Sequence, residues 1–154
     1  MCSYENLLND ANSHGLKVIE MDFESDAKGL CSGNLIGLRK DMPATEKACI
    51  LAEEIGHFET TVGNILDQSN SNNRKQEVSA RKWAVDKLLD IEDLFRAGDA
   101  RCSTLYEVAE YLEVTEEFLM EALAVFKRRY GQSYTSGEKT LIFNDRGFII
   151  TQQN

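Results

Sequence analysis

The sequence predicts an α+β fold, with short strands near both ends of the chain and helices through its middle. Two short apolar runs, residues 16–21 and 34–39, have the composition and turn-forming flanks of strands. Several longer segments repeat apolar residues at helical spacing. Residues 140–151 contain two β-branched and aromatic runs separated by Asn144 to Gly147, a pattern that predicts a terminal β-hairpin.

The N-terminal half predicts two helices. The first covers residues 4–13 and ends before Gly15, which supplies a left-handed cap. The second covers residues 43–58, with Pro43 in the opening turn and Thr45 as the N-cap. Residues 25–30 are expected to form a turn or a single helical turn.

The C-terminal half predicts three more helices. In chain order, the expected elements are a polar loop over residues 60–73, one helix over 74–94, a helix from Ser103 or Thr104 to Tyr111, and a helix from Thr115 to Tyr130. We expect two parts, a core domain over residues 1–98 and a C-terminal segment over 99–154 that packs on it.

Composition and charge exclude several classes of partner and location. The formal net charge of -9 repels phosphate backbones, so no direct nucleic-acid partner is expected. No apolar run approaches the ~20 residues needed to span a bilayer, and no secretory signal is apparent, so we expect a cytoplasmic protein without a membrane partner. The four cysteines are widely spaced and are expected to be free thiols.

The second predicted helix carries the letters E-E-I-G-H at residues 53–57. In the H-E-x-x-H motif of zinc proteases, two histidines face one metal and the glutamate between them is the general base that activates water. Here Glu54 and His57 match the base and the second histidine, and Glu53 replaces the first histidine. Carboxylate oxygens bind zinc at ~2.0–2.2 Å, much as imidazole does, so Glu53 and His57 remain candidate ligands on one helical face.

A catalytic metal site needs about three protein ligands and an open position for water. Glu77, near the start of the next strong helix, is the candidate third ligand. Two carboxylates and one imidazole would make the metal less electrophilic and weaken its preference for zinc over manganese or iron. Gly56 costs about 1 kcal/mol inside a helix, so we expect another element to pack closely there. Alone, these five residues also match a solvated acidic helix face.

A second segment makes the pattern more specific. Leu51 to His57, followed by Gln76 to Ala84, resembles the ImmA/IrrE family of metallopeptidases, in which L-A-H-E-x-G-H precedes a helix of the form E-x-x-A-x-x-F-A. Glu77, Ala80 and Trp83 fall at the matching offsets, with Trp83 in the aromatic place. The resemblance covers residues 16–89. Within this range the chain is similar to relatives encoded by phages and integrative elements of Gram-positive bacteria.

The resemblance implies a zincin-like metalloprotease core, in which a short sheet packs on the metal-site helix. It implies Glu54 as the general base and Glu53, His57 and Glu77 as ligands of a divalent metal, zinc first and Mn²⁺ or Fe²⁺ as alternatives. It further implies a metallo-endopeptidase that cleaves a phage-type transcriptional repressor by metal-activated water, an anti-repressor of a mobile genetic element. Glu53 stands where most members have histidine, which leaves catalytic activity open.

Two alternatives accompany this hypothesis. The first is a non-catalytic protein that sequesters a repressor through the same surface. Residues 103–129 have the rhythm of a helix-turn-helix unit, but glutamates occupy the positions of base contacts, which favours packing or partner recognition over DNA binding. Asp67 is a possible hydrogen-bond partner of His57, although a loop aspartate or a helix cap explains it more simply.

Overall fold

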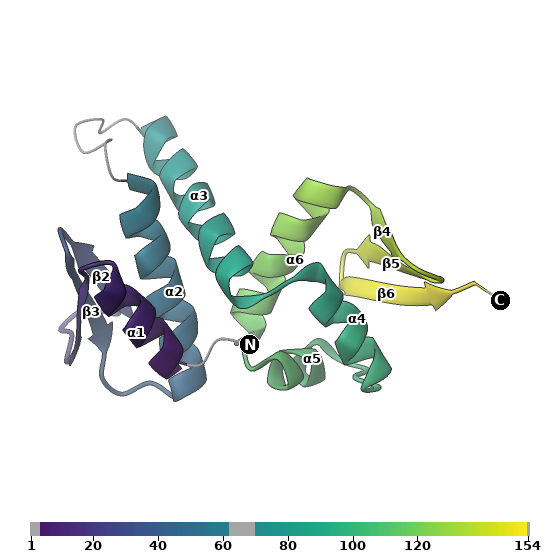
Figure 1. Cartoon of the computed structure of the whole chain (residues 1–154), viewed down its shortest axis with the longest axis horizontal. Coiled ribbons are helices and arrows are strands. Elements are labelled where there is room, and N and C mark those ends of the chain that lie inside the picture. The colour runs from purple at the N-terminus through teal and green to yellow at the C-terminus, as the bar shows by residue number, and fades with distance from the viewer. Residues whose placement is uncertain (1–3, 62–69, 154) are drawn as a thin grey trace. The chain divides into compact units, whose positions relative to one another are not determined.

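The computed structural model describes residues 4–61 and 70–153. Its contacts divide into two compact units, unit 1 (Met1–Leu88) and unit 2 (Leu89–Asn154). Each unit combines helices with one three-stranded sheet (Figure 1). The predicted α+β fold class is therefore confirmed. The expected domain boundary after residue 98 is not tested by this division and stays a prediction.

Unit 1 is built on a small mixed sheet with the strand order β1-β3-β2. Strand β1 runs parallel to β3, and β2 pairs with β3 in the antiparallel sense, which leaves β2 at an edge. The elements of unit 1 are α1 (Tyr4–Ser13), β1 (Lys17–Met21), β2 (Gly29–Ser32), β3 (Leu35–Arg39), α2 (Ala44–Thr61) and α3 (Asn70–Leu88).

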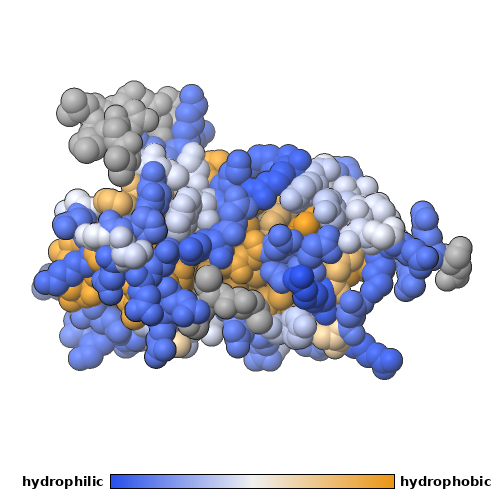
Figure 2. All heavy atoms as spheres, in the orientation of Figure 1, coloured by the Kyte–Doolittle hydropathy of each residue, from blue (hydrophilic) through white to orange (hydrophobic). Residues whose placement is uncertain are grey.

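The core of unit 1 lies between the sheet and its helices. Ile36 and Leu38 alternate along β3 and are fully buried, as are Leu51 and Ile55 of α2. Side chains on a strand alternate between the two faces, so these two strand residues point to the helical side. The opposite face of the sheet keeps apolar side chains in solvent, among them Leu30, which is 55% exposed. Figure 2 shows hydrophobic atoms at the surface over this end of unit 1.

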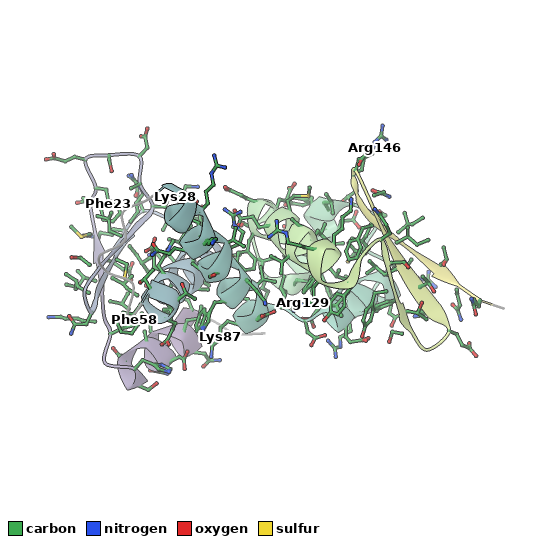
Figure 3. The ribbon with its side chains drawn as sticks, turned by 90° about the horizontal axis from the view of Figure 1, so that it is seen from above. Phe23, Lys28, Phe58, Lys87, Arg129 and Arg146 are labelled. Carbon is green, nitrogen blue, oxygen red and sulfur yellow. The ribbon has the colours of Figure 1, made fainter. Side chains whose placement is uncertain are left out.

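Unit 2 packs three helices with an antiparallel sheet of order β4-β5-β6. The predicted terminal hairpin is confirmed as β5 and β6, with Arg146 at its tip (Figure 3). Leu141 and Phe143 of β5 are buried, and Tyr134 of β4 stacks edge-on against Tyr130 at 4.8 Å. The elements are α4 (Ile91–Asp99), α5 (Leu105–Leu112), α6 (Glu116–Tyr130), β4 (Ser133–Ser136), β5 (Lys139–Asn144) and β6 (Gly147–Gln152).

Side-chain caps begin all three helices of unit 2. Thr104 and Thr115 accept hydrogen bonds from backbone amides in the first turns of α5 and α6, as their sequence predicts. Asp90 caps α4, and the Asp93 carboxylate accepts a hydrogen bond from the Asp90 amide, forming a capping box. The caps satisfy amides that a helix leaves without an internal partner.

Several boundaries differ from the expectation. The helix predicted over 74–94 is two helices, because the Asp90 capping box starts α4 after α3 has ended at Leu88. Thr45 is not the N-cap, since α2 already begins at Ala44 and Lys47 donates to the Pro43 carbonyl. Residues 25–30 were expected to form a turn, but Gly29 and Leu30 belong to β2, which pairs with β3. The expected loop is helical at 60–61 and from 70 onward, and residues 62–69 lie outside the described part.

Within the described residues, no helix has the length and apolar character required to cross a membrane. Cys31, Cys49 and Cys102 are free thiols, as expected, whereas Cys2 lies outside the described residues. His14 follows the end of α1 and places Nδ1 2.8 Å from the Asp10 carbonyl oxygen, where the imidazole interacts with the carbonyl end of the helix.

Candidate functional site

A cleft of about 580 Å³ separates the edge strand β2 from the C-terminal half of α2. Glu54, His57 and Phe58 line it from the helix, and Gly29 and Cys31 line it from the strand. The three helix residues share a face because side chains three and four positions apart lie one above the other on a helix. Figure 3 shows Phe58 on the side of α2 that faces the strands, so the cleft has an apolar wall beside its ionisable groups.

Glu54 lies beneath Gly29, the first residue of β2. A Cβ added at Gly29 would meet the Glu54 Oε1 at 3.0 Å and the Ile50 Cγ2 at 2.7 Å. Only glycine leaves room for the carboxyl group and for Ile50 at this position. Burial raises the pKa of Glu54 to about 7, since a charged carboxylate loses hydration in the cleft. A carboxyl group with this pKa can take and return a proton near neutral pH.

His57 has the electrostatic environment of a neutral imidazole. Burial lowers its pKa, and the cation of Arg81 lowers it further, while the charge of Glu77 opposes both effects. A neutral imidazole has a lone pair available for a metal ion. His57 therefore suits ligation, and the electrostatic effect of Glu77 means that α3 brings this carboxylate near the imidazole.

The close approach expected at Gly56 is confirmed. A Cβ at Gly56 would lie 2.5 Å from the backbone oxygen of Ala80, so α2 and α3 cross here with their backbones in contact. Glu77 lies about one helical turn before Ala80. The crossing therefore sets His57, the neighbour of Gly56, and Glu77 on adjoining parts of two packed helices. This placement depends on a glycine that helix propensity alone disfavours.

The structure brings only some of the predicted metal ligands close together. Glu53 lies on α2, one turn before His57, and Glu77 is exposed on α3. Among residues 4–61 and 70–153, no three side chains of the types His, Cys, Asp and Glu converge on one metal position. The structure thus brings Glu54 and His57 into one cleft and Glu77 within electrostatic range of His57. The assignment of Glu53, His57 and Glu77 as metal ligands stays a prediction.

The sequence did not identify the opposite wall of the cleft. Cys31 lies in β2, and burial together with the charge of Glu54 raises the pKa of its thiol. Gly29 and Gly33, which flank this short apolar segment, were the available sign of a strand that passes close to other atoms. Phe58, at helical spacing with the buried residues of α2, also lines the cleft. Asp67, a candidate partner of His57, lies outside the described residues.

A protein-family model matches most of the chain. Residues 11–124 match the model of Peptidase M78, the IrrE N-terminal-like domain. The match covers more than half of the chain. The chain belongs to the Peptidase M78 family. Comparisons with curated proteins and with solved structures give no significant match.

Membership in Peptidase M78 confirms the ImmA/IrrE resemblance and a metallopeptidase-type function. The matched range contains all of the predicted site, Glu53, Glu54, His57 and Glu77, and it reaches into α6 of unit 2. The sheet of unit 2 lies after the matched residues. The residues that line the cleft between α2 and β2 all lie within the matched range.

Proposed function

We propose that this M78 protein is a metal-dependent endopeptidase that hydrolyses a peptide bond in the cleft between α2 and β2. The observation that carries the proposal is the position of Glu54, which is held under Gly29 beside His57 and has its pKa raised to about 7 by burial. Glu54 acts as the general base toward water and then returns the proton to the leaving amine.

A divalent metal fits this site in part. His57 is a neutral imidazole near the carboxylate of Glu77, and these two types of side chain bind zinc. Glu53 completes the proposed set, although the described residues do not converge as three ligands. When bound, the metal supplies Lewis-acid activation of water and of the carbonyl group. Zinc is the first candidate, and the two carboxylates also suit Mn²⁺ or Fe²⁺.

The decisive variant is Glu54→Gln, which keeps the size of the side chain and removes the base. We expect cleavage to fall by about 10²–10⁴-fold while the fold and metal content remain unchanged. The assay incubates the protein with the repressor encoded beside it and follows the fragments by mass spectrometry, with and without chelator. Glu24→Gln, an exposed glutamate outside the cleft, is the matched control. Cleavage by Glu54→Gln at the control rate would reject the assigned base.

The proposed substrate is a phage-type transcriptional repressor, so that cleavage releases a mobile genetic element from repression in the cytoplasm. The support is the resemblance of residues 51–57 and 76–84 to the ImmA/IrrE segments. A small cleft with one apolar wall suits a protease that selects one protein partner rather than many peptides.

A second candidate is a non-catalytic protein that binds and sequesters the repressor through the same surface. Glu53 favours it, because an added anionic ligand offsets the positive charge of a metal. Metal content and cleavage separate the two candidates. A protein that is saturated with Zn²⁺, Mn²⁺ or Fe²⁺ in turn and leaves a bound repressor intact is a sequestering protein. Cleavage that requires one of these metals establishes the peptidase.

A further inference from the structure

Helix α5 presents an aromatic and acidic face to solvent. Its buried residues, Val108, Ala109 and Leu112, all lie on one side of the helix. The opposite side consists of two tyrosines that flank two glutamates: Tyr106, Glu107, Glu110 and Tyr111. Tyr106 is 57% exposed and Tyr111 is 42% exposed. We call these four residues, together with Glu116 at the start of α6, the α5 face.

Two carboxylates of the α5 face, those of Glu110 and Glu116, lie near Tyr106. Its hydroxyl donates to the Glu110 Oε1 at 2.7 Å. The hydrogen bond to Glu110 raises the pKa of Tyr106, and the charge of Glu116 adds to the effect, so carboxylates from both helices lie near this ring. Glu107 accepts from the backbone amide of Ser103 at 2.9 Å. The Tyr106 hydroxyl and the Ser103 amide are uncharged donors, so these hydrogen bonds leave the negative charges in place.

No cationic side chain interrupts this acidic segment in the sequence. Residues 102–126 contain six glutamates and no lysine, arginine or histidine. The basic residues of α6, Lys127 to Arg129, come in its last turn, where cations complement the helix dipole. A helix-turn-helix unit that reads DNA presents the N-terminal residues of its second helix to the bases, and here these are Glu116 and Glu117. The α5 face therefore repels nucleic acid and attracts cations.

We propose that the α5 face docks an arginine-bearing segment of a partner protein. A guanidinium group binds a carboxylate through two parallel hydrogen bonds and stacks on an aromatic ring. The α5 face supplies both elements, since Tyr106 and Tyr111 flank Glu107 and Glu110 on one exposed side of the helix. Lysine matches the charge and also approaches an aromatic ring as a cation, but its compact ammonium group lacks the planar face and the paired donors of a guanidinium. We therefore expect the docked segment to carry arginine, and positive charge alone to be insufficient.

The test measures binding of the full chain to two labelled peptides of the same length and charge, one with arginines and one with lysines, by fluorescence anisotropy. We expect the arginine peptide to bind about threefold or more tightly than the lysine peptide, because the planar guanidinium stacks on the exposed tyrosines and donates paired hydrogen bonds to a carboxylate. Tyr106→Leu together with Tyr111→Leu should remove this preference and leave the lysine peptide nearly unaffected. Circular dichroism verifies that this double variant keeps its helices.

A matched pair of charge variants separates the α5 face from general attraction to an acidic protein. Glu107→Gln, Glu110→Gln and Glu116→Gln, combined, should weaken arginine-peptide binding about tenfold at low salt. The control combines Asp22→Asn, Glu24→Gln and Asp26→Asn, which removes the same charge from exposed positions of unit 1 and should weaken binding less than twofold. Equal losses in the two variants, or no preference for arginine, would overturn the proposal.

Two further outcomes concern the occupant. Sedimentation of the chain alone at low salt tests whether the basic end of α6 in a second copy fills the α5 face. Self-association that disappears in the Glu107, Glu110 and Glu116 variant would identify a second copy and reject a different protein as the occupant. Binding of a DNA duplex that weakens in the same variant would contradict the electrostatic argument. Docking at the α5 face does not depend on peptidase activity. A negative result in these binding tests would therefore leave the proposed function unaffected.

Discussion

The helices of unit 1 and unit 2 obey local rules to different degrees. In unit 2, each helix has a side-chain cap, and the apolar face of each is buried as the sequence pattern requires. In unit 1, the C-terminal half of α2 carries a half-buried glutamate, Glu54, and a glycine, Gly56. Proteins depart from local consistency mainly at functional sites. The contrast indicates that contacts with β2 and α3 determine the residues of α2, whereas local caps and apolar faces account for the helices of unit 2.

The largest expected effect is that of Gly56→Ala. In an exposed helix this change stabilises by about 1 kcal/mol, because alanine has the higher helix propensity. Here the added Cβ would lie 2.5 Å from the Ala80 oxygen, so α2 and α3 must separate. We expect a loss of about 3 kcal/mol in the free energy of unfolding, measured by urea denaturation.

The contact at Gly56 needs a glycine control whose surroundings are open. Gly131 has nothing within 4 Å of an added Cβ, but its φ is +88°, a conformation that non-glycine residues rarely adopt. Gly131→Ala should therefore cost about 1 kcal/mol from backbone strain alone. A Gly56→Ala protein as stable as the wild type would show that the helices do not cross at this point.

An intermediate effect is expected from Glu54→Gln in metal-free protein. Burial raises the folded-state pKa of Glu54 to about 7, above the ordinary 4.5, so folding favours the protonated form. The wild type is therefore expected to lose stability as pH rises from 4.5 to 7, and the neutral glutamine to escape this loss. Above pH 7 the variant should be more stable by on the order of 2 kcal/mol, after a discount for the exposed part of the group.

The pH dependence of the melting temperature tests this sign. Wild type and Glu54→Gln should have similar melting temperatures near pH 4 and diverge toward pH 8. Glu24→Gln, an exposed glutamate in the loop before β2, should follow the wild type throughout. Parallel curves for wild type and Glu54→Gln would mean that the carboxylate is well hydrated in the cleft.

The smallest effects concern the helix caps. Thr104→Ala and Thr115→Ala should each reduce the free energy of unfolding by about 1 kcal/mol, because each removes an acceptor from a backbone amide. Thr45→Ala, at the predicted cap that lies inside α2, should change it by less than about 0.5 kcal/mol. Chemical denaturation resolves these values. A larger loss at Thr45 than at Thr115 would reverse the comparison between the two units.

Much of the fold was predictable where the determinants are local. The caps Thr104 and Thr115, the bounds of α1 and the terminal hairpin follow from residues next to one another in the sequence. Strand β2 was missed because its four residues carry no clear alternation and pair only after β3 has formed. The break between α3 and α4 was missed because the apolar pattern continues through it, although Asp90 and Asp93 have the spacing of a capping box.

The candidate site also has some features that are local in the sequence and others that depend on tertiary contacts. The sequence alone determined the family and the spacing of Glu54 and His57 along one helix, because these depend on residue type and order in the chain. Only the tertiary structure decided that Gly29 of β2 covers Glu54 and that Gly56 brings α3 against α2. These contacts join segments distant in sequence, and burial between them sets the pKa of Glu54, which no local pattern encodes.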